Sequence, residues 1–250
     1  MIDRRAVEER LRQAGCVAAE AEAVELLAAT PDDRTLEAWI ERRETGEPLA
    51  WVVGAMTFCG VRVRVDGGVF VPRAHSEELA RRAAAATPPR GRVADLCTGS
   101  GAVGAAVAHL ARSTAVVGVD VDPRSARCAN RNGVPTVVGD LGAPLRDRSF
   151  DVVVAVAPYV PTDELAFLPA DVRRFEPGHA LDGGPDGLDT VRRIAEDATR
   201  LVRHAGRLLL EVGGDQATEL SARLPELGFD AIETWSDEDG LPRGVAARLV

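Results

Sequence analysis

The sequence predicts an α/β fold built on a mostly parallel sheet of seven strands. From Arg92 onward, short valine-rich runs alternate with segments of helical periodicity, which is the pattern of parallel strands joined by helices. A glycine-rich turn, CTGSG, separates the first of these runs from the helical segment after it. The chain before Arg92 is helical and then hairpin-like, so we expect a smaller N-terminal part beside one large domain.

Residues 1–47 are expected to form a small N-terminal helical domain. Apolar residues such as Val7 and Leu11 recur there at helical spacing, and Pro31 interrupts the pattern. A segment this short buries too little apolar surface to be stable alone. We therefore expect it to pack against the rest of the chain.

Residues 48–75 are expected to form a β-hairpin linker. The stretch TFCGVRVRVDGGVFVPR alternates apolar and polar residues, and Gly67-Gly68 in its middle is predicted to make the turn. Its expected inward residues are Val61, Val63 and Val65. Ser76 is predicted to cap the next helix, which opens the domain of residues 76–250.

The strands and helices of the large domain follow from the same periodicity. We place strands at 92–97, 115–120, 135–138, 150–156, 206–213, 229–235 and 244–249. Helices are expected at 102–112, 123–131, 187–204 and 215–227. A ligand crevice is expected at the carboxyl ends of the first strands, where Asp95, Asp120 and Asp140 all lie.

The glycine-rich turn predicts a bound ligand. Gly99, Gly101 and Gly104 satisfy the dinucleotide pattern G-x-G-x-x-G, and the following helix directs its positive dipole end at the turn. An acid at Asp95 would repel a pyrophosphate, whereas it suits the ammonium of S-adenosylmethionine (SAM). A nicotinamide cofactor rests on the glycine spacing alone. A tight turn without a ligand is the simplest alternative.

Two later acids support SAM. Asp120 ends the next apolar run, about 20 residues on, where an acid that binds ribose is expected. Asp140 could accept a hydrogen bond from the adenine amino group, with Leu141 against the ring. Each acid alone is more often a solvated strand end. The full expected cofactor set is Asp95, Cys97, Thr98, Gly99, Ser100, Gly101, Asp120, Val121, Asp140 and Leu141, with Cys97 a packing residue.

Composition excludes several classes of function. The net charge of −9 disfavours a nucleic-acid binder, and the absence of lysine excludes lysine-based catalysis. No apolar run is long enough for a membrane span, and the charged N-terminus lacks the core of a signal peptide. The four cysteines and four histidines are scattered, so we expect neither metal nor disulfides, and a reduced, cytoplasmic setting.

The stretch from Asp151 to Asp189 is the second informative region. FDVVVAVAPYVP is expected to be a strand ending in Pro158-Tyr159, which would line the same crevice as the glycine turn. A proline stop with a packed aromatic is the alternative. The long connection that follows, including LDGGPDGLD, is expected to cover the substrate.

With these motifs in view, the sequence resembles the HemK/PrmC protein-glutamine methyltransferases. The matching segments, from about Arg43 to the C-terminus, are TGEPLAWVVG, GVFVPRAHSEEL, DLCTGSGAVG, APYVP, EPGHALDGGPDGLD and LLLEVGGDQ. The chain also resembles a shorter, actinobacterial-type branch of that family. The resemblance implies a Rossmann-like SAM-dependent methyltransferase fold and methylation of a glutamine side-chain amide in a peptide-chain release factor.

The resemblance also implies the catalytic residues. The family motif Asn-Pro-Pro-Tyr falls on Val156, Ala157, Pro158 and Tyr159. The family's Asn side chain and the following carbonyl accept hydrogen bonds from the substrate amide. Val156 has no side-chain acceptor, while Ala157 keeps its carbonyl.

Three functional hypotheses follow. The first is a SAM-dependent N-methyltransferase acting on a release-factor glutamine, with Arg73 among the substrate-binding residues. The second is a small-molecule N-methyltransferase acting on free arginine or a similar amino acid, whose guanidinium would pair with Glu176, Glu211 or Asp182. The third is a non-catalytic SAM-binding or interaction protein that has lost activity at Val156.

Overall fold

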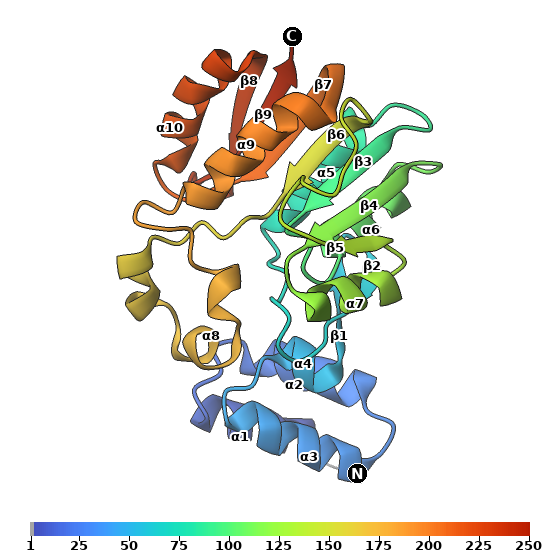
Figure 1. The fold of residues 1–250 in the computed structure, drawn as a ribbon. Helices are drawn as coiled ribbons and strands as arrows, with labels where there is room; N and C mark the ends of the chain where they lie inside the picture. The colour runs from blue at the N-terminus through green and yellow to red at the C-terminus, as the bar shows by residue number, and fades with distance from the viewer. Residues whose placement is uncertain (1–2) are drawn as a thin grey trace.

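The structure, a computed structural model, describes residues 3–250; residues 1 and 2 of the expected helical domain lie outside the described residues. A seven-stranded sheet forms its centre, in the order β5-β4-β3-β6-β7-β9-β8 (Figure 1). The strands are β3 (Arg92–Leu96), β4 (Ala115–Asp120), β5 (Thr136–Val138), β6 (Phe150–Ala155), β7 (Val202–Glu211), β8 (Phe229–Ser236) and β9 (Pro242–Leu249). The predicted α/β fold with a mostly parallel sheet is confirmed.

The pairing of the strands explains where a ligand site can form. Strands β3 to β7 run parallel, and only β9 runs antiparallel to its neighbours β7 and β8. The strand order reverses between β3 and β6, and a crevice opens at such a point beyond the carboxyl ends of the strands. Asp95 near the end of β3 pairs with Val154 of β6 and Gly118 of β4, so it lies in the centre of the sheet.

Helices cover both faces of the sheet (Figure 1). They are α5 (Ser76–Ala86), α6 (Ala102–Leu110), α7 (Pro123–Arg131), α9 (Asp189–Leu201), α10 (Gln216–Arg223) and the short 3₁₀ turn η3 (Leu224–Leu227). Alternate residues of β6 face opposite sides: Val152 and Val154 pack with α5 and α6, and Val153 packs with α9. This alternation buries both faces, which is why the strand reads as a continuous apolar run.

The boundary between α9 and β7 differs from the prediction. The expected helix of 187–204 ends at Leu201, and β7 begins at Val202 rather than 206. Val202 pairs with Phe150 before the register shifts, and Ala205 has a φ of 62°. An irregular strand start of this kind interrupts the periodicity on which the sequence prediction depended.

The N-terminal segment forms a helical layer below the sheet (Figure 1). Its helices are α1 (Arg4–Gln13), α2 (Ala19–Ala29), α3 (Asp33–Glu44) and α4 (Leu49–Val53). Val7, Leu11 and Ile40 are fully buried in a core of their own, which Val52 of α4 joins. The linker expected to begin at residue 48 therefore starts with a helical turn that packs on the preceding helices, and the hairpin begins only afterwards.

The hairpin turn lies earlier than predicted. Strands β1 (Ala55–Phe58) and β2 (Val61–Arg64) pair around Cys59-Gly60, not around Gly67-Gly68. Cys59 and Gly60 have φ angles of 48° and 75°, the left-handed pair that a two-residue hairpin turn requires. The inward positions are Val63 and Val65, which are fully buried, and Val61, which is partly buried.

The connection between β6 and α9 contains η1 (Thr162–Phe167), α8 (Ala170–Phe175) and η2 (Gly178–Ala180). It reaches down to the N-terminal layer (Figure 1). The rings of Phe175 and Trp51 meet edge to face with centroids 6.3 Å apart, and Arg174 donates a hydrogen bond to the Thr45 carbonyl. Among residues 3–250, no helix combines the length and apolar character that a membrane span needs.

Candidate active site

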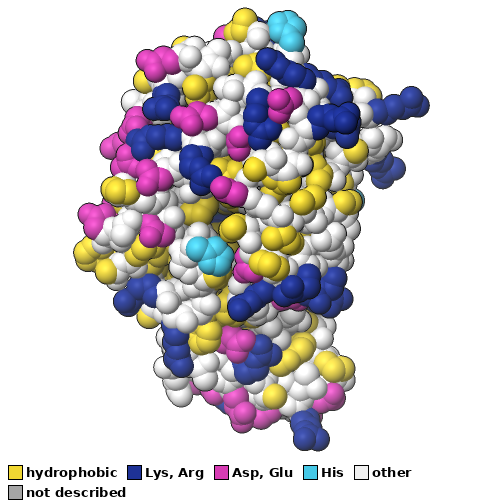
Figure 2. Space-filling view, viewed as in Figure 1, with side chains coloured by type: hydrophobic (Ala, Val, Ile, Leu, Met, Phe, Trp, Pro, Cys, Tyr) yellow, Lys and Arg dark blue, Asp and Glu magenta, His cyan; other side chains and the backbone are white. Residues whose placement is uncertain are grey.

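A cavity of about 720 Å³ lies at the carboxyl ends of β3, β4 and β6. Hydrophobic side chains gather around the middle of this face of the molecule (Figure 2). The expected site residues that line the cavity are Arg73, Asp95, Cys97, Thr98, Gly99, Ser100, Asp120, Val121, Asp140, Leu141, Val156, Ala157, Pro158 and Tyr159. The expected site residues Gly101, Glu176 and Glu211 do not line it.

The glycine turn has the shape that a ligand cradle needs. Gly99 and Gly101 have φ angles of 56° and 80°, a region that glycine occupies without strain. A Cβ on Gly101 would lie 2.9 Å from the Cβ of Ala129, so the side chain is excluded by close packing under α7. A Cβ on Gly99 would meet nothing within 4 Å, because this residue borders the open cavity.

Asp95 is the most deeply buried acid of the site, with 1% of its surface exposed. Its Oδ2 accepts hydrogen bonds from the Thr98 hydroxyl at 2.6 Å and the Gly104 N–H at 3.0 Å. Among residues 3–250, its Oδ1 has no hydrogen-bond partner, and neither has the buried hydroxyl of Ser100. Burial raises the pKa of Asp95 to about 7, although these hydrogen bonds oppose the shift. Two polar atoms without partners at a cavity wall indicate a polar ligand group there, and the ammonium of SAM fits.

Asp120 lies at the end of β4 and supports the same ligand. Its carboxylate accepts hydrogen bonds from the Gly99 N–H at 2.8 Å and the Asp122 N–H at 2.9 Å. Burial raises its pKa, while these bonds favour the ionised form. Each carboxylate oxygen still has a lone pair for a hydroxyl donor such as a ribose.

Asp140 follows β5 at the outer rim of the cavity. Its carboxylate is 61% exposed and forms an ion pair at 2.6 Å with Arg193 of α9. Leu141 beside it is buried and has a φ of 46°, which turns the chain back over the cavity. The three predicted acids are thus brought to one cavity, as their positions after successive parallel strands required.

Val156, Ala157, Pro158 and Tyr159 follow β6 directly and form the opposite half of the cavity. Other side chains that line the cavity come from the hairpin, the segment after it and the β6–α9 connection, and they are mostly apolar. They are Phe58, Phe70, Pro72, Leu168, Pro169 and Val172, together with the polar Arg73 and Ser76. We refer to this part as the acceptor half, and to the part around Asp95, Asp120 and Asp140 as the donor half.

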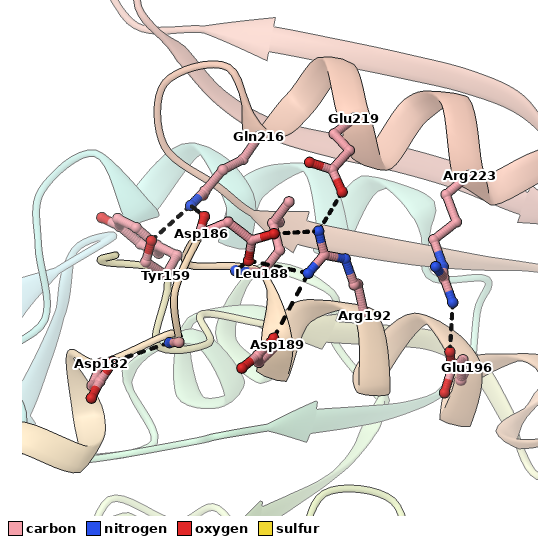
Figure 3. Close-up of polar contacts among 11 residues, drawn as sticks. Tyr159, Asp182, Asp186, Leu188, Asp189, Arg192, Glu196, Gln216, Glu219 and Arg223 are labelled. Carbon is pink, nitrogen blue, oxygen red and sulfur yellow. Dashed lines mark hydrogen bonds and ion pairs between the residues drawn. The ribbon is translucent and has the colours of Figure 1, made fainter. Parts of the chain in front are cut away.

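Tyr159 is held from several sides. Its backbone carbonyl accepts a hydrogen bond from the Gln216 side chain at 2.8 Å (Figure 3). The Gln216 side chain in turn accepts a hydrogen bond from the Gly213 N–H. Burial raises the pKa of the Tyr159 phenol to about 12, and the neighbouring Glu211 carboxylate adds to the shift. The phenol is therefore neutral and fixed at the cavity wall.

Hydrogen bonds and ion pairs hold both ends of the segment LDGGPDGLD. The Val160 N–H donates to the Leu181 carbonyl at 3.0 Å, which joins the start of the connection to its end. Arg192 of α9 pairs with both Asp186 and Glu219 (Figure 3). The connection contributes Leu168, Pro169, Val172 and Leu181 to the cavity wall, and its expected role in covering the substrate stays a prediction.

The carboxylates expected to meet a substrate cation already have partners. Glu176 accepts hydrogen bonds from Arg73 at 2.6 Å and from the Val71 N–H at 3.2 Å. Glu211 lies 3.2 Å from the His75 ring nitrogen. Both side chains are 2% exposed and lie behind the cavity wall.

Asp182 is also engaged in local contacts. It accepts hydrogen bonds from the Thr162 hydroxyl at 2.7 Å and the Gly184 N–H at 3.0 Å. These hydrogen bonds lower its pKa, so the carboxylate is ionised. It is not among the residues that line the cavity.

The predicted cap of α5 is wrong. The helix begins at Ser76, its N-cap is His75, and no side chain caps it. Ser76 instead lines the cavity with 3% of its surface exposed and its hydroxyl unpartnered. Neither Ser76 nor the apolar residues of the acceptor half were predicted, because they come from distant segments that carry no common motif.

Comparisons with known proteins agree with this geometry. A family model described as a methyltransferase domain matches residues 93–178. Two solved structures share the fold: the ribosomal protein L11 methylase of Lactobacillus delbrueckii subsp. bulgaricus has a TM-score of 0.53 at 16% identity, covering 71% of this chain and 81% of that one. A 16S rRNA methyltransferase of T. thermophilus has a TM-score of 0.54 at 18% identity, covering 78% and 44%.

Curated relatives are more similar in sequence. The release factor glutamine methyltransferase of Thermodesulfovibrio yellowstonii is 32% identical over 220 residues, which is 84% of this chain and 79% of the relative. That of Geobacter sulfurreducens is 35% identical over 216 residues, covering 84% and 76%. With the seven-stranded fold and the cavity at its strand ends, this similarity makes the chain a SAM-dependent methyltransferase that belongs to the release factor glutamine methyltransferase family.

Proposed function

We propose that this chain transfers a methyl group from SAM to the side-chain amide nitrogen of a glutamine in a peptide-chain release factor. The observation that supports this most strongly is the electrical neutrality of the acceptor half. Its arginine, Arg73, is paired with Glu176, and its other lining residues are mostly apolar. Such a wall suits an uncharged acceptor like an amide.

The donor half is assigned to SAM. Asp95 and the N–H groups of the Gly99–Gly101 turn would hold the methionyl part, while Asp120 would hold the ribose and Asp140 with Leu141 the adenine. When bound, SAM supplies a methyl group on a positively charged sulfur, which is already activated for transfer. The protein therefore needs no strong base before the transfer. Its residues have to orient the acceptor nitrogen.

Orientation of the amide is assigned to the Ala157 carbonyl, with Pro158 and Tyr159 fixing the position of that backbone. The Gln216 hydrogen bond to the Tyr159 carbonyl supports a rigid turn here. Val156, where the family motif has Asn, offers no second acceptor. Loss of that hydrogen bond is expected to slow the reaction by about tenfold or more, since one hydrogen bond contributes about 1.5 kcal/mol.

Free arginine is the second acceptor we considered, and the charges argue against it. A guanidinium needs an available carboxylate. The carboxylates of Glu176 and Glu211 are already paired behind the cavity wall.

The proposal is tested by incubating the chain with methyl-labelled SAM and either release factor or free arginine. We expect label on the release factor, and mass spectrometry should locate it on a single glutamine. Replacing that glutamine by glutamate in the release factor should abolish labelling. Label on free arginine, or on the Gln→Glu release factor, would contradict the proposal.

A further inference from the structure

A band of exposed arginines lies beside the mouth of the cavity. It consists of Arg62 and Arg64 on β2 and of Arg124, Arg127 and Arg131 on α7, and we refer to it as the arginine strip. The strip is unusual in a chain whose net charge is −9. Basic side chains cross the face in Figure 2 at the height that α7 takes in Figure 1.

The strip is one continuous surface. Residues 124, 127 and 131 follow helical spacing, so their side chains share the outward face of α7. Strand β2 is joined to the end of this helix, because the Arg64 backbone exchanges two hydrogen bonds of 2.8 Å with the Asn132 side chain. The opposite face of α7 is buried through Ala126 and Ala129.

Most of these charges are uncompensated. Within residues 3–250, Arg64, Arg124 and Arg127 form no ion pair, while Arg131 pairs with Asp66. Glu25 lies close enough to Arg62 for their charges to interact. By contrast, many arginines elsewhere on the surface are matched by carboxylates, as Arg192 is by Asp186 and Glu219. A row of unmatched arginines keeps a positive potential on this face.

The strip adjoins the cavity. Ser125, next to Arg124 on α7, is one of the lining residues, as is Phe70 on the segment after β2. The Arg124 guanidinium reaches that segment, since a Cβ on Gly68 would lie 3.2 Å from its Nη1. The arginine strip is therefore close enough to the cavity to contact a macromolecule that presents a side chain to it.

We infer that the arginine strip docks an acidic surface of the acceptor protein next to the glutamine to be methylated. This inference rests on the proposed function, because it assumes a protein acceptor. A protein surface is favoured over RNA, since the net charge of −9 opposes general binding to a polyanion. Exposed charges around an interface mainly speed association and set its salt dependence.

The test compares Arg124→Gln/Arg127→Gln with the matched control Arg112→Gln/Arg146→Gln. The control removes two exposed arginines that form no ion pair within residues 3–250 and that lie in the loops before β4 and β6, at the amino ends of these strands and so opposite the cavity. Methyl transfer is measured to intact release factor and to a short peptide containing its acceptor glutamine. Affinity for release factor and for an RNA duplex is measured separately.

We expect the strip variant to raise KM for release factor by about fivefold to tenfold at low salt, with kcat unchanged, because its charges act on association. High salt should remove the difference. Peptide kinetics, SAM affinity and the control variant should match the unsubstituted chain. Unchanged release-factor affinity in the strip variant overturns the inference, and so does a loss confined to RNA. If the unsubstituted chain methylates neither protein nor peptide, the proposed function fails. The comparison of release-factor affinities between the strip variant and the unsubstituted chain then tests the docking role of the arginine strip by itself.

Discussion

The donor and acceptor halves of the cavity differ in whether their charged side chains have partners within the protein. Within residues 3–250, the donor half leaves a carboxylate oxygen, Asp95 Oδ1, and the Ser100 hydroxyl buried without partners. In the acceptor half, the Arg73 guanidinium is matched by Glu176, the unpartnered polar atom is the uncharged Ser76 hydroxyl, and the remaining wall is mostly apolar. Unsatisfied buried polar atoms are costly unless a ligand completes them. The donor half is therefore built for a charged ligand, and the acceptor half for a neutral one.

The largest expected effect comes from removing the buried charge of the donor half. Asp95→Asn keeps the size of the side chain but cannot neutralise an ammonium, so SAM affinity should fall by about a hundredfold, as for loss of a charge-assisted hydrogen bond. Calorimetric titration with SAM checks this. The SAM-free variant should unfold at the same temperature as the unsubstituted chain or higher, because the buried carboxylate carries a desolvation cost. Unchanged SAM affinity would remove Asp95 from the donor site.

The second prediction concerns the ion pair between Glu176 and Arg73 beside the acceptor half. Glu176→Gln should lower the free energy of unfolding by about 2 kcal/mol, because it leaves the partly buried Arg73 guanidinium without its countercharge. Denaturant unfolding measures this cost. Because Glu176 lies behind the cavity wall, KM for release factor should change little. Asp171→Asn, which removes a carboxylate from the same connection, is the matched control. A large rise in KM without loss of stability would show that Glu176 binds substrate directly.

The Val156 position tests whether the apolar wall limits the rate. Val156→Asn supplies a side-chain acceptor beside the Ala157 carbonyl, so kcat for release factor should rise by about tenfold. Val156→Leu, which has about the shape of Asn but no hydrogen-bonding atom, is the control for volume. No increase with Asn would mean that the amide is oriented by the backbone alone, and activity that appears only with Asn would mean that the natural acceptor is different.

The smallest expected effect is on pH dependence, and its sign follows from burial. Burial raises the pKa of Asp95 to about 7, so the carboxyl takes up a proton as the pH falls through that value. Between about pH 8 and pH 6.5, SAM affinity should therefore drop by about fourfold.

Stability without SAM should move the opposite way. A carboxyl with a raised pKa in the folded state destabilises the fold as it ionises, so the melting temperature should fall as the pH rises through about 7. Asp95→Asn should remove the contribution of Asp95 to the pH dependence of SAM affinity and of the melting temperature. If both pH dependences persist unchanged in the variant, another titratable group causes them.

The two halves also differ in what the sequence predicts about them. The donor half comes from short stretches that each end a strand, so Asp95, Asp120 and Asp140 could be read from apolar runs followed by an acid. The acceptor half gathers Phe58, Phe70 and Val172 from three separate segments. No local pattern joins such residues, and their contact depends on how the connection folds back onto the hairpin.

The hairpin shows a second limit of sequence reading. Both Cys59-Gly60 and Gly67-Gly68 contain glycine between valine-rich runs, and composition favours the glycine pair. The turn forms at Cys59-Gly60 because that choice buries Val63 and Val65. Which strand face packs against the rest of the fold determines the register of the hairpin, and this packing cannot be read from the local sequence.

A crystal structure with S-adenosylhomocysteine, the demethylated product, tests most directly whether the donor and acceptor halves belong to one active site. We predict that its amino group meets Asp95, that its adenosine lies between Asp120 and Asp140, and that its sulfur points toward Val156–Tyr159. A product bound with its sulfur turned away from these residues, or bound outside this cavity, would contradict the account.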